Sequence, residues 1–197
     1  MSILTGPRIR QIVNRTKEFR KQGFPPPIPA IDIEPFDPAL CGPNSYDVHL
    51  APELLCYDIE YILDMKKENE ANPLTIPEEG LVLIPGILYL GTTVERTWCA
   101  GLVPWLDGRS SVGRLGMFLH ITAGRGDDNF DGHWTCEISV VQPLRIYPNV
   151  RIGQITFLTI DGDRQPYQGQ YQKVQTGPVP SGMWRDFLPK LAEPEGK

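Results

Sequence analysis

The stretch TCEISVV, residues 135–141, alternates between two kinds of side chain and is typical of a half-buried β-strand. Successive side chains of a strand point to opposite faces, so one face carries Cys136, Ile138 and Val140. The other face carries Thr135, Glu137 and Ser139. A carboxylate in the middle of such a strand has two explanations. Either this face meets solvent, or it lines a pocket in which a partly desolvated Glu137 acts as a general base.

Short runs of apolar and β-branched residues occupy much of the chain on both sides of this strand. They read LVLIPGILYLGTTV (81–94), GMFLHITA (116–123), LRIYP (144–148) and IGQITFLTI (152–160). Pro, Gly, Asn and Asp separate them, and the 20 prolines among 197 residues are about twice the average share. Short strands between frequent turns predict a mainly β fold, a sandwich or a barrel-like sheet.

One substantial helix is expected, from Thr5 to Lys21. A helical stripe there contains Ile9, Ile12, Val13, Thr16 and Phe19. Thr5 is a candidate cap, and Pro7 suits the first turn. The following segment GFPPPIPA, residues 23–30, cannot continue the helix because consecutive prolines favour an extended chain.

The length allows one domain with a real core, so we expect a single domain over residues 1–197. Within it, residues 1–30 form the helix and the proline-rich arm. Residues 162–197 lose the strand pattern and are expected to form a mobile C-terminal tail.

Composition restricts the class of protein. No apolar stretch is long enough to span a membrane, and the N-terminus does not read as a signal peptide, so a cytoplasmic protein without a membrane partner is expected. The net charge of −5 argues against binding a nucleic-acid polymer. The four cysteines form no C-x-x-C pair and are expected to be reduced thiols.

A catalytic zinc is not expected either. Zinc-dependent base deaminases need a His-x-Glu and a Pro-Cys-x-x-Cys. The three histidines, His49, His120 and His133, stand in no such setting.

A phosphate-binding cluster is indicated by Arg109, Ser110, Ser111 and Arg114, which place two guanidinium groups and two hydroxyls within six residues. The same residues could form a surface turn that enters a helix, with a serine as the cap. The segment Gly124–Gly132 is likewise open to two interpretations. It could close a β-hairpin, or it could offer a carboxylate to a sugar hydroxyl.

Taken in order, these motifs resemble the dCTP deaminase family of the dUTPase superfamily. The resemblance rests on GRSSVGRLG (108–116), HITAG (120–124), the turn ending in Phe-Asp-Gly (130–132), Glu137 and PNVRIGQ (148–154). It extends to Ile3-Leu4, to PFDPALCGPNSYDVHL (35–50) and to residues 171–181. It therefore covers most of the chain.

The resemblance implies a distorted β-barrel or jelly roll of the dUTPase type, assembled as a homotrimer with active sites between subunits. It implies hydrolysis of dCTP to dUTP and ammonia without zinc, with Mg²⁺ bound through the substrate triphosphate. Glu137 is then the general base, which takes a proton from the attacking water and passes it toward cytosine N3 and the leaving amine.

The remaining roles are implied in the same way. Ser110, Arg114 and the carbonyl of Ala123 position the water and the carboxylate. Arg109 and Ser111 contact phosphate, Asp127 contacts the 3′-hydroxyl, and Thr135 with the Cys136 backbone contacts the base edge. Base or triphosphate is also held by Gln154, Tyr167, Tyr171 and Gln175, the last three from a tail that closes over the nucleotide.

Two departures from the family pattern stand out. The family usually has Ile-Asp-Pro-Gly-Phe where this chain has Gly-Asp-Asp-Asn-Phe, residues 126–130. The tail motif Lys-Tyr-Gln-Gly-Gln is here Gln-Tyr-Gln-Lys-Val-Gln, residues 170–175, with one extra residue.

Three alternatives to a dUTP-forming deaminase remain open. The first is a bifunctional enzyme that combines dCTP deaminase with dUTP diphosphatase and releases dUMP. The second, a dUTPase, fits less well because such enzymes generally lack the strand glutamate and end in a glycine-rich motif that this chain does not have. The third is a non-catalytic trimeric protein that binds nucleotide or has a structural role.

Overall fold

A computed structural model describes residues 2–120, 122–173 and 176–188. The helix α1 (Gly6–Lys21) comes first, followed by β1 (Ala30–Glu34) and the 3-10 helix η1 (Pro38–Leu40). Strands β2 (Tyr46–Tyr57), β3 (Ala71–Thr75), β4 (Leu81–Leu83), β5 (Tyr89–Ala100) and β6 (Leu102–Gly108) follow. After the short helix α2 (Ser110–Gly113) come β7 (Met117–Leu119), β8 (Asp131–Val140), β9 (Leu144–Ile146), β10 (Arg151–Thr159) and the 3-10 helix η2 (Met183–Phe187).

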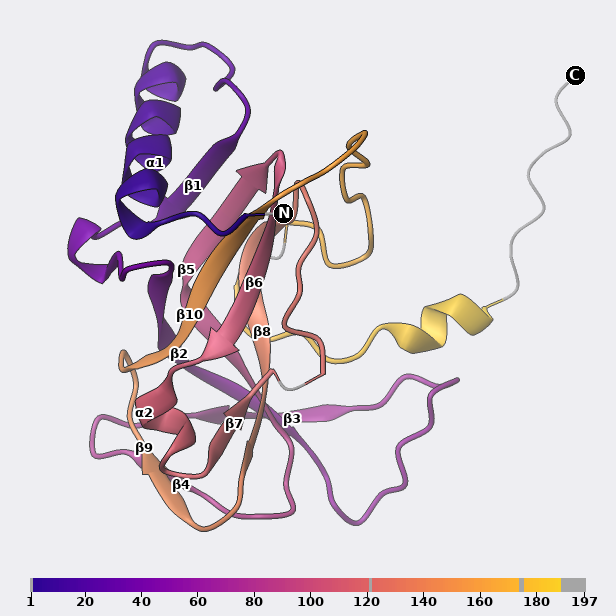
Figure 1. The fold of residues 1–197 in the computed structure, drawn as a ribbon. Coiled ribbons are helices and arrows are strands. Elements are labelled where there is room, and N and C mark those ends of the chain that lie inside the picture. The colour runs from indigo at the N-terminus through magenta and orange to yellow at the C-terminus, as the bar shows by residue number, and fades with distance from the viewer. Residues whose placement is uncertain (1, 121, 174–175, 189–197) are drawn as a thin grey trace, which may run out of the picture.

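The strands form a nearly closed, barrel-like antiparallel sheet, which confirms the predicted fold class (Figure 1). Its main path runs β6-β10-β2-β5-β8-β7, with β1 paired to β5 and β3 paired to β2. A separate two-stranded sheet pairs β4 with β9. Strands adjacent in the sheet are often distant in the sequence, so the sheet brings separate motifs together.

The helix α1 packs against β1 at one end of the sheet (Figure 1). Ile9, Ile12 and Val13 are fully buried, as the stripe predicts, while Phe19 is half-buried. Thr5 occupies the N-cap position but makes no side-chain cap hydrogen bond. Apolar burial, rather than capping, therefore holds this helix in place.

Strand β8 contains the stretch 135–140 and shows the predicted alternation along its whole length. Its apolar face contributes Cys136 and Ile138, both fully buried, to a core shared with β2, β5 and β10. The stretch 81–94 is divided between β4 and β5 because Pro85 and Gly86 interrupt it.

The described part of the tail leaves β10 and returns across the outer side of the sheet to η2 (Figure 1). The mobility expected for residues 162–197 stays a prediction. Among the described residues, no helix is both long enough and apolar enough to cross a bilayer.

Candidate active site

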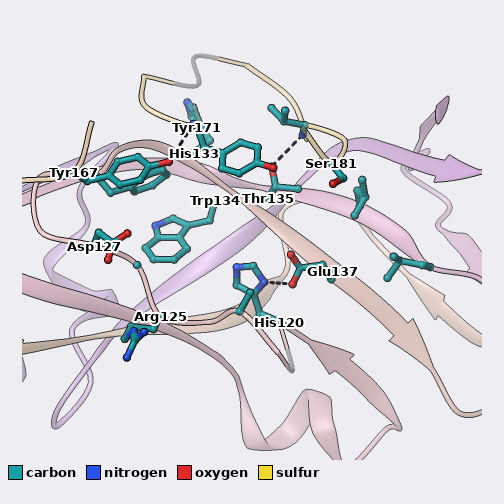
Figure 2. A pocket seen from close by; sticks show the side chains of 16 residues that line it. His120, Arg125, Asp127, His133, Trp134, Thr135, Glu137, Tyr167, Tyr171 and Ser181 are labelled. Atoms are coloured by element: carbon teal, nitrogen blue, oxygen red, sulfur yellow. Dashed lines mark hydrogen bonds and ion pairs between the residues drawn. The ribbon is translucent and has the colours of Figure 1, made fainter. Parts of the chain in front are cut away.

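A cavity of about 440 Å³ opens between β8, the loop that precedes it and the tail (Figure 2). The loop supplies His120, Ala123, Arg125, Gly126, Asp127 and Phe130. Strand β8 supplies His133, Trp134, Thr135 and Glu137, and the tail supplies Tyr167, Tyr171, Val179 and Ser181. Leu88 and Leu90 complete the wall. Apolar walls with a few converging polar groups are typical of a small-molecule site.

Glu137 and Thr135 reach the cavity because they lie on the outward face of β8. The carboxylate-bearing side chain of Glu137 is 36% exposed, so it is accessible from the cavity. Cys136 points to the opposite face and is fully buried. Only its backbone can face a ligand, as the resemblance implies. The structure thus supports the pocket interpretation of Glu137 over the solvent interpretation.

His120 contacts the carboxylate of Glu137 through Nδ1, and its backbone N–H donates to the Glu137 carbonyl at 3.1 Å. Its side chain is 6% exposed and meets the Trp134 ring edge-on, with ring centroids 6.1 Å apart. The backbone of His120 has a positive φ of 55°, uncommon for a residue other than glycine. An imidazole thus orients one oxygen of the candidate base.

Sequence reasoning considered His120 only as a zinc ligand and assigned it no role in the site. The pairing of β7 with β8 is the feature that would have identified His120 as a site residue. Leu119 pairs with Ile138, so an antiparallel register places the next residue, His120, beside Glu137. Trp134 and Arg125 were also missed, and Phe130 was noted only as part of the Phe-Asp-Gly motif, with no role in the site.

The turn over residues 124–130 forms one side of the cavity. Ala123 and Asp127 line it, in agreement with their predicted positions. The turn lies against β6, because the Gly126 N–H donates to the Pro104 carbonyl at 2.8 Å. A Cβ at Gly126 would approach Trp134 Cη2 within 2.5 Å, so the close packing there requires glycine.

The tail forms the roof of the cavity in a chain of hydrogen bonds (Figure 2). The Tyr171 N–H donates to the Tyr167 hydroxyl at 3.2 Å, and the Gly182 N–H donates to the Tyr171 hydroxyl at 3.0 Å. The Val179 N–H donates to the Thr135 hydroxyl at 3.0 Å. Tyr167 and Tyr171 therefore occupy the predicted site, whereas Gln175 lies outside the described residues.

The predicted phosphate cluster lies elsewhere on the chain. Ser110 and Ser111 are the first two residues of α2, and Arg109 occupies the N-cap position in place of the serine suggested by the surface-turn interpretation. The exposed members of the cluster are Ser110, Ser111 and Arg114. All four cluster residues are described, and none of them lines the cavity.

A second polar group forms around Asp47, which sequence reasoning did not assign to the site. Arg109 Nε lies 3.2 Å from Asp47 Oδ2, and Arg151 Nη1 lies 3.4 Å from the same oxygen. Gln154 is paired with Asp47 on one side and with Asp107 on the other. One chain therefore presents two separate groups. The cavity group carries Glu137, and the Asp47 group carries Arg109 and Gln154 next to α2.

Burial raises the pKa of the Cys136 thiol, and the neighbouring charge of Glu137 raises it further. Burial likewise raises the pKa of Cys99. Both thiols stay protonated near neutral pH, so they act as apolar core groups and not as nucleophiles.

Within the described ranges, no three side chains of the His, Cys, Asp and Glu types come together as metal ligands. Mg²⁺ commonly binds through one or two carboxylates together with substrate phosphates. The Asp47 carboxylate is already paired with Arg109 and Arg151, so its surroundings are cationic and do not form a ligand set for Mg²⁺.

Comparisons with known proteins agree with these observations. Residues 27–160 match the family model described as dCTP deaminase-like. A protein of Hathewaya histolytica named "dCTP deaminase, dUMP-forming" is 56% identical over 158 residues, which cover 80% of this chain and 91% of that protein. A protein of the same name from Leptospira biflexa serovar Patoc is 54% identical over 161 residues, which cover 81% and 91%.

Among solved structures, the 2′-deoxycytidine 5′-triphosphate deaminase of Agrobacterium tumefaciens superposes with a TM-score of 0.57. The match covers 80% of this chain and 47% of that chain. With 18% sequence identity, the likeness supports the fold alone.

Proposed function

The chain belongs to the dCTP deaminase-like family, and on this premise we propose that it deaminates dCTP by hydrolysis and releases dUMP. One dCTP and two water molecules would give ammonia, dUMP and pyrophosphate. The two relatives, both named as dUMP-forming, favour this bifunctional reaction over a reaction that stops at dUTP.

The observation that carries the proposal is the position of Glu137 on the wall of an aromatic-lined cavity, next to Thr135. A cytosine ring fits between apolar and aromatic walls, and the polar atoms of β8 are available to its edge. A carboxylate in such a cavity can act as a general base when it lies within hydrogen-bond reach of the reacting water.

We assign the deamination step to Glu137. The carboxylate takes a proton from water as the water oxygen bonds to C4 of cytosine, and it delivers the proton to N3. Glu137 then takes the proton of the new C4 hydroxyl and delivers it to the amino group, so that the C4–N4 bond breaks, ammonia leaves, and the C4 carbonyl of uracil forms. His120 holds one carboxylate oxygen, so it limits how Glu137 can turn toward the water.

Binding of the nucleotide is assigned to both polar groups. Thr135 and the Cys136 backbone read the base, and Asp127 accepts from the 3′-hydroxyl. Arg109, Ser111 and Gln154 hold the triphosphate, with Mg²⁺ as part of the substrate. Ser110 and Arg114 support the water and Glu137, while Tyr167 and Tyr171 cover the nucleotide.

A homotrimer follows from this assignment, again as a proposal. On one chain the residues of the Asp47 group do not line the cavity, so the α2 cluster of one subunit would complete the cavity of the next. Closed rotational symmetry would then give three equivalent sites.

The product assay tests the proposal directly. The protein is incubated with dCTP and Mg²⁺, and dUTP, dUMP, pyrophosphate and ammonia are separated and quantified. We expect ammonia, dUMP and pyrophosphate in equal amounts. Accumulation of dUTP would assign the chain to the plain deaminases, and absence of ammonia would overturn the proposal.

Glu137→Gln should abolish ammonia release, a loss of at least about a thousandfold, while binding of dCTP measured by calorimetry changes little, because the amide cannot accept the proton. Ser139→Ala is the matched control, since Ser139 shares the face of β8 with Glu137 but lies outside the cavity. The control should retain full turnover. Undiminished turnover in Glu137→Gln would remove Glu137 from the mechanism.

A further inference from the structure

The tail is joined to the cavity wall by a bidentate ion pair between Arg164 and Asp128. Arg164 Nε donates to Asp128 Oδ2 at 2.7 Å, and Arg164 Nη2 donates to Oδ1 at 2.9 Å. Asp128 is 5% exposed, and its Oδ1 also accepts the Gly101 N–H at 2.7 Å. A buried carboxylate is costly unless it is paired, so the conformation of the turn depends on Arg164.

Further contacts follow the ion pair along the same turn. The Tyr167 N–H donates to the Asp128 carbonyl at 2.7 Å, and the Lys173 N–H donates to the Asp131 carbonyl at 2.7 Å. The side-chain amide of Gln172 donates to the Asn129 carbonyl at 2.7 Å and accepts the Asp131 N–H at 3.1 Å. The tail segment 164–173 is thus fixed to the turn 128–131 at both of its ends.

This junction lies behind the cavity wall and not in it. The loop that contains this turn supplies Asp127 and Phe130 to the wall, and the tail supplies Tyr167 and Tyr171. The rings of Phe130 and Tyr167 lie 6.3 Å apart, so the two segments meet at the cavity. Arg164 and Asp128 do not line the cavity. They can affect a ligand only through the residues that they hold.

We propose that Arg164 and Asp128 are positioning residues, whose ion pair sets Asp127 and Tyr167 in the geometry that receives the nucleotide. The inference rests on the proposed function, because it takes dCTP as the ligand of the cavity. Asp128 lies in the turn at which this chain departs from the usual family motif.

An exposed ion pair would not support such a role, because exposed ion pairs contribute little to the stability of a conformation. This pair differs in two respects. Asp128 is buried, and both of its oxygens are engaged by the fork of one guanidinium, an arrangement that fixes orientation as well as distance. Lysine cannot reproduce the fork, since it offers a single ammonium group.

Arg164→Gln tests the proposal with two readouts. We expect KM for dCTP to rise about tenfold or more, the size expected when charge-assisted hydrogen bonds are lost, with kcat changed by less than about threefold. Without nucleotide, the amides of Tyr167 and Lys173 should exchange with deuterium at least about tenfold faster, because both donate to the turn. Arg164→Lys should give a smaller change in the same direction.

Arg8→Gln is the control, because Arg8 is an exposed arginine whose guanidinium donates to Gln11 within the same helix α1. It should leave both readouts unchanged. If Arg164→Gln fails to fold, the same readouts on Arg164→Lys decide the matter.

Unchanged exchange at Tyr167 and Lys173 would overturn the anchor, and faster exchange with an unchanged KM would overturn its positioning role. A loss of kcat equal to the rise in KM would also overturn it, since Glu137 would then be disturbed. The exchange readout needs no turnover. If the proposed function is wrong, the wild-type protein gives no ammonia in the product assay. If the anchor is wrong, deuterium exchange at Tyr167 and Lys173 is unchanged in Arg164→Gln.

Discussion

Cys136 and Glu137 are neighbours in the chain with opposite surroundings. Cys136 is fully buried in the core, whereas the side chain of Glu137 is 36% exposed to the cavity. The pleat of β8 alone produces this difference, because consecutive side chains leave a strand on opposite faces. A shift of one residue in the pairing of β8 would bury the carboxylate and expose the thiol.

Burial of Cys99 and Cys136 predicts a loss of stability at alkaline pH. Each has a folded-state pKa raised above its ordinary value of 9.0. The thiols of the unfolded chain therefore lose their protons at a lower pH than the thiols of the folded chain. The contribution of the two thiols to the free energy of unfolding is fully present below pH 9 and falls as the pH rises further. Each thiol should reduce the free energy of unfolding by about 1.4 kcal/mol per pH unit above that point.

Urea unfolding at pH 7.5, 8.5, 9.5 and 10 checks this expectation, at fixed protein concentration and with a reducing agent. Cys136→Ala lowers stability at every pH by creating a cavity, but its decline above pH 9 should be shallower than that of the wild type. Equal slopes in the two proteins would contradict the assignment. Cys56, which is half-buried, provides the matched control as Cys56→Ala.

At the scale of elements, β2, β10 and β6 gather residues that are far apart in the sequence. Gln154 on β10 pairs with Asp47 on β2 and with Asp107 on β6. The Arg109 N–H donates to the Ile152 carbonyl at 3.0 Å, which places the start of α2 beside this row. Three adjacent strands therefore build one polar surface on which Arg109 and Arg151 point toward Asp47.

Asp47→Asn should raise KM for dCTP several-fold and change kcat little. The carboxylate holds Arg109 and Arg151, and the loss of these charge-assisted pairs frees the guanidinium group of Arg109, which we assign to phosphate binding. Steady-state kinetics at fixed Mg²⁺ provides the measurement. Glu53→Gln, an exposed residue of the same strand, should behave as wild type. An unchanged KM in Asp47→Asn would show that this surface does not receive the triphosphate.

At the scale of the whole molecule, Glu137, which we propose as the base, lines the cavity, whereas the residues of the α2 cluster do not. The cavity opens between β8 and the tail, whereas α2 follows β6 and packs against β7. A site that needs both groups is therefore incomplete in one chain. Assembly of copies around a rotation axis would complete it.

Mixing two inactive variants tests this prediction. Glu137→Gln lacks the base of the cavity, and Arg114→Gln lacks the support from α2. Refolded together in equal amounts, they should regain about a quarter of wild-type activity, because random assembly leaves about one interface in four with both groups intact.

Thr135→Val mixed with Glu137→Gln is the control, since both changes affect the cavity group and no interface is left intact. Light scattering should show a trimer in every sample. Failure of the first mixture to regain activity, although mixed trimers form, would place the complete site within one chain.

The strand pattern, the N-terminal helix and the outward face of Glu137 were determined by the sequence alone. Alternation and helical periodicity depend on neighbours in the chain, so TCEISVV and the Ile9 stripe reveal them directly. The order of the motifs also indicated the family, and with it Ala123, Asp127, Tyr167 and Tyr171 at the cavity.

Only the tertiary structure decided which of these residues meet. Strand pairing brought His120 to Glu137 and Asp47 to Gln154, and tail docking brought Arg164 to Asp128. These contacts join residues up to 107 positions apart. Register and docking depend on the packing of the entire sheet, so no local pattern contains them.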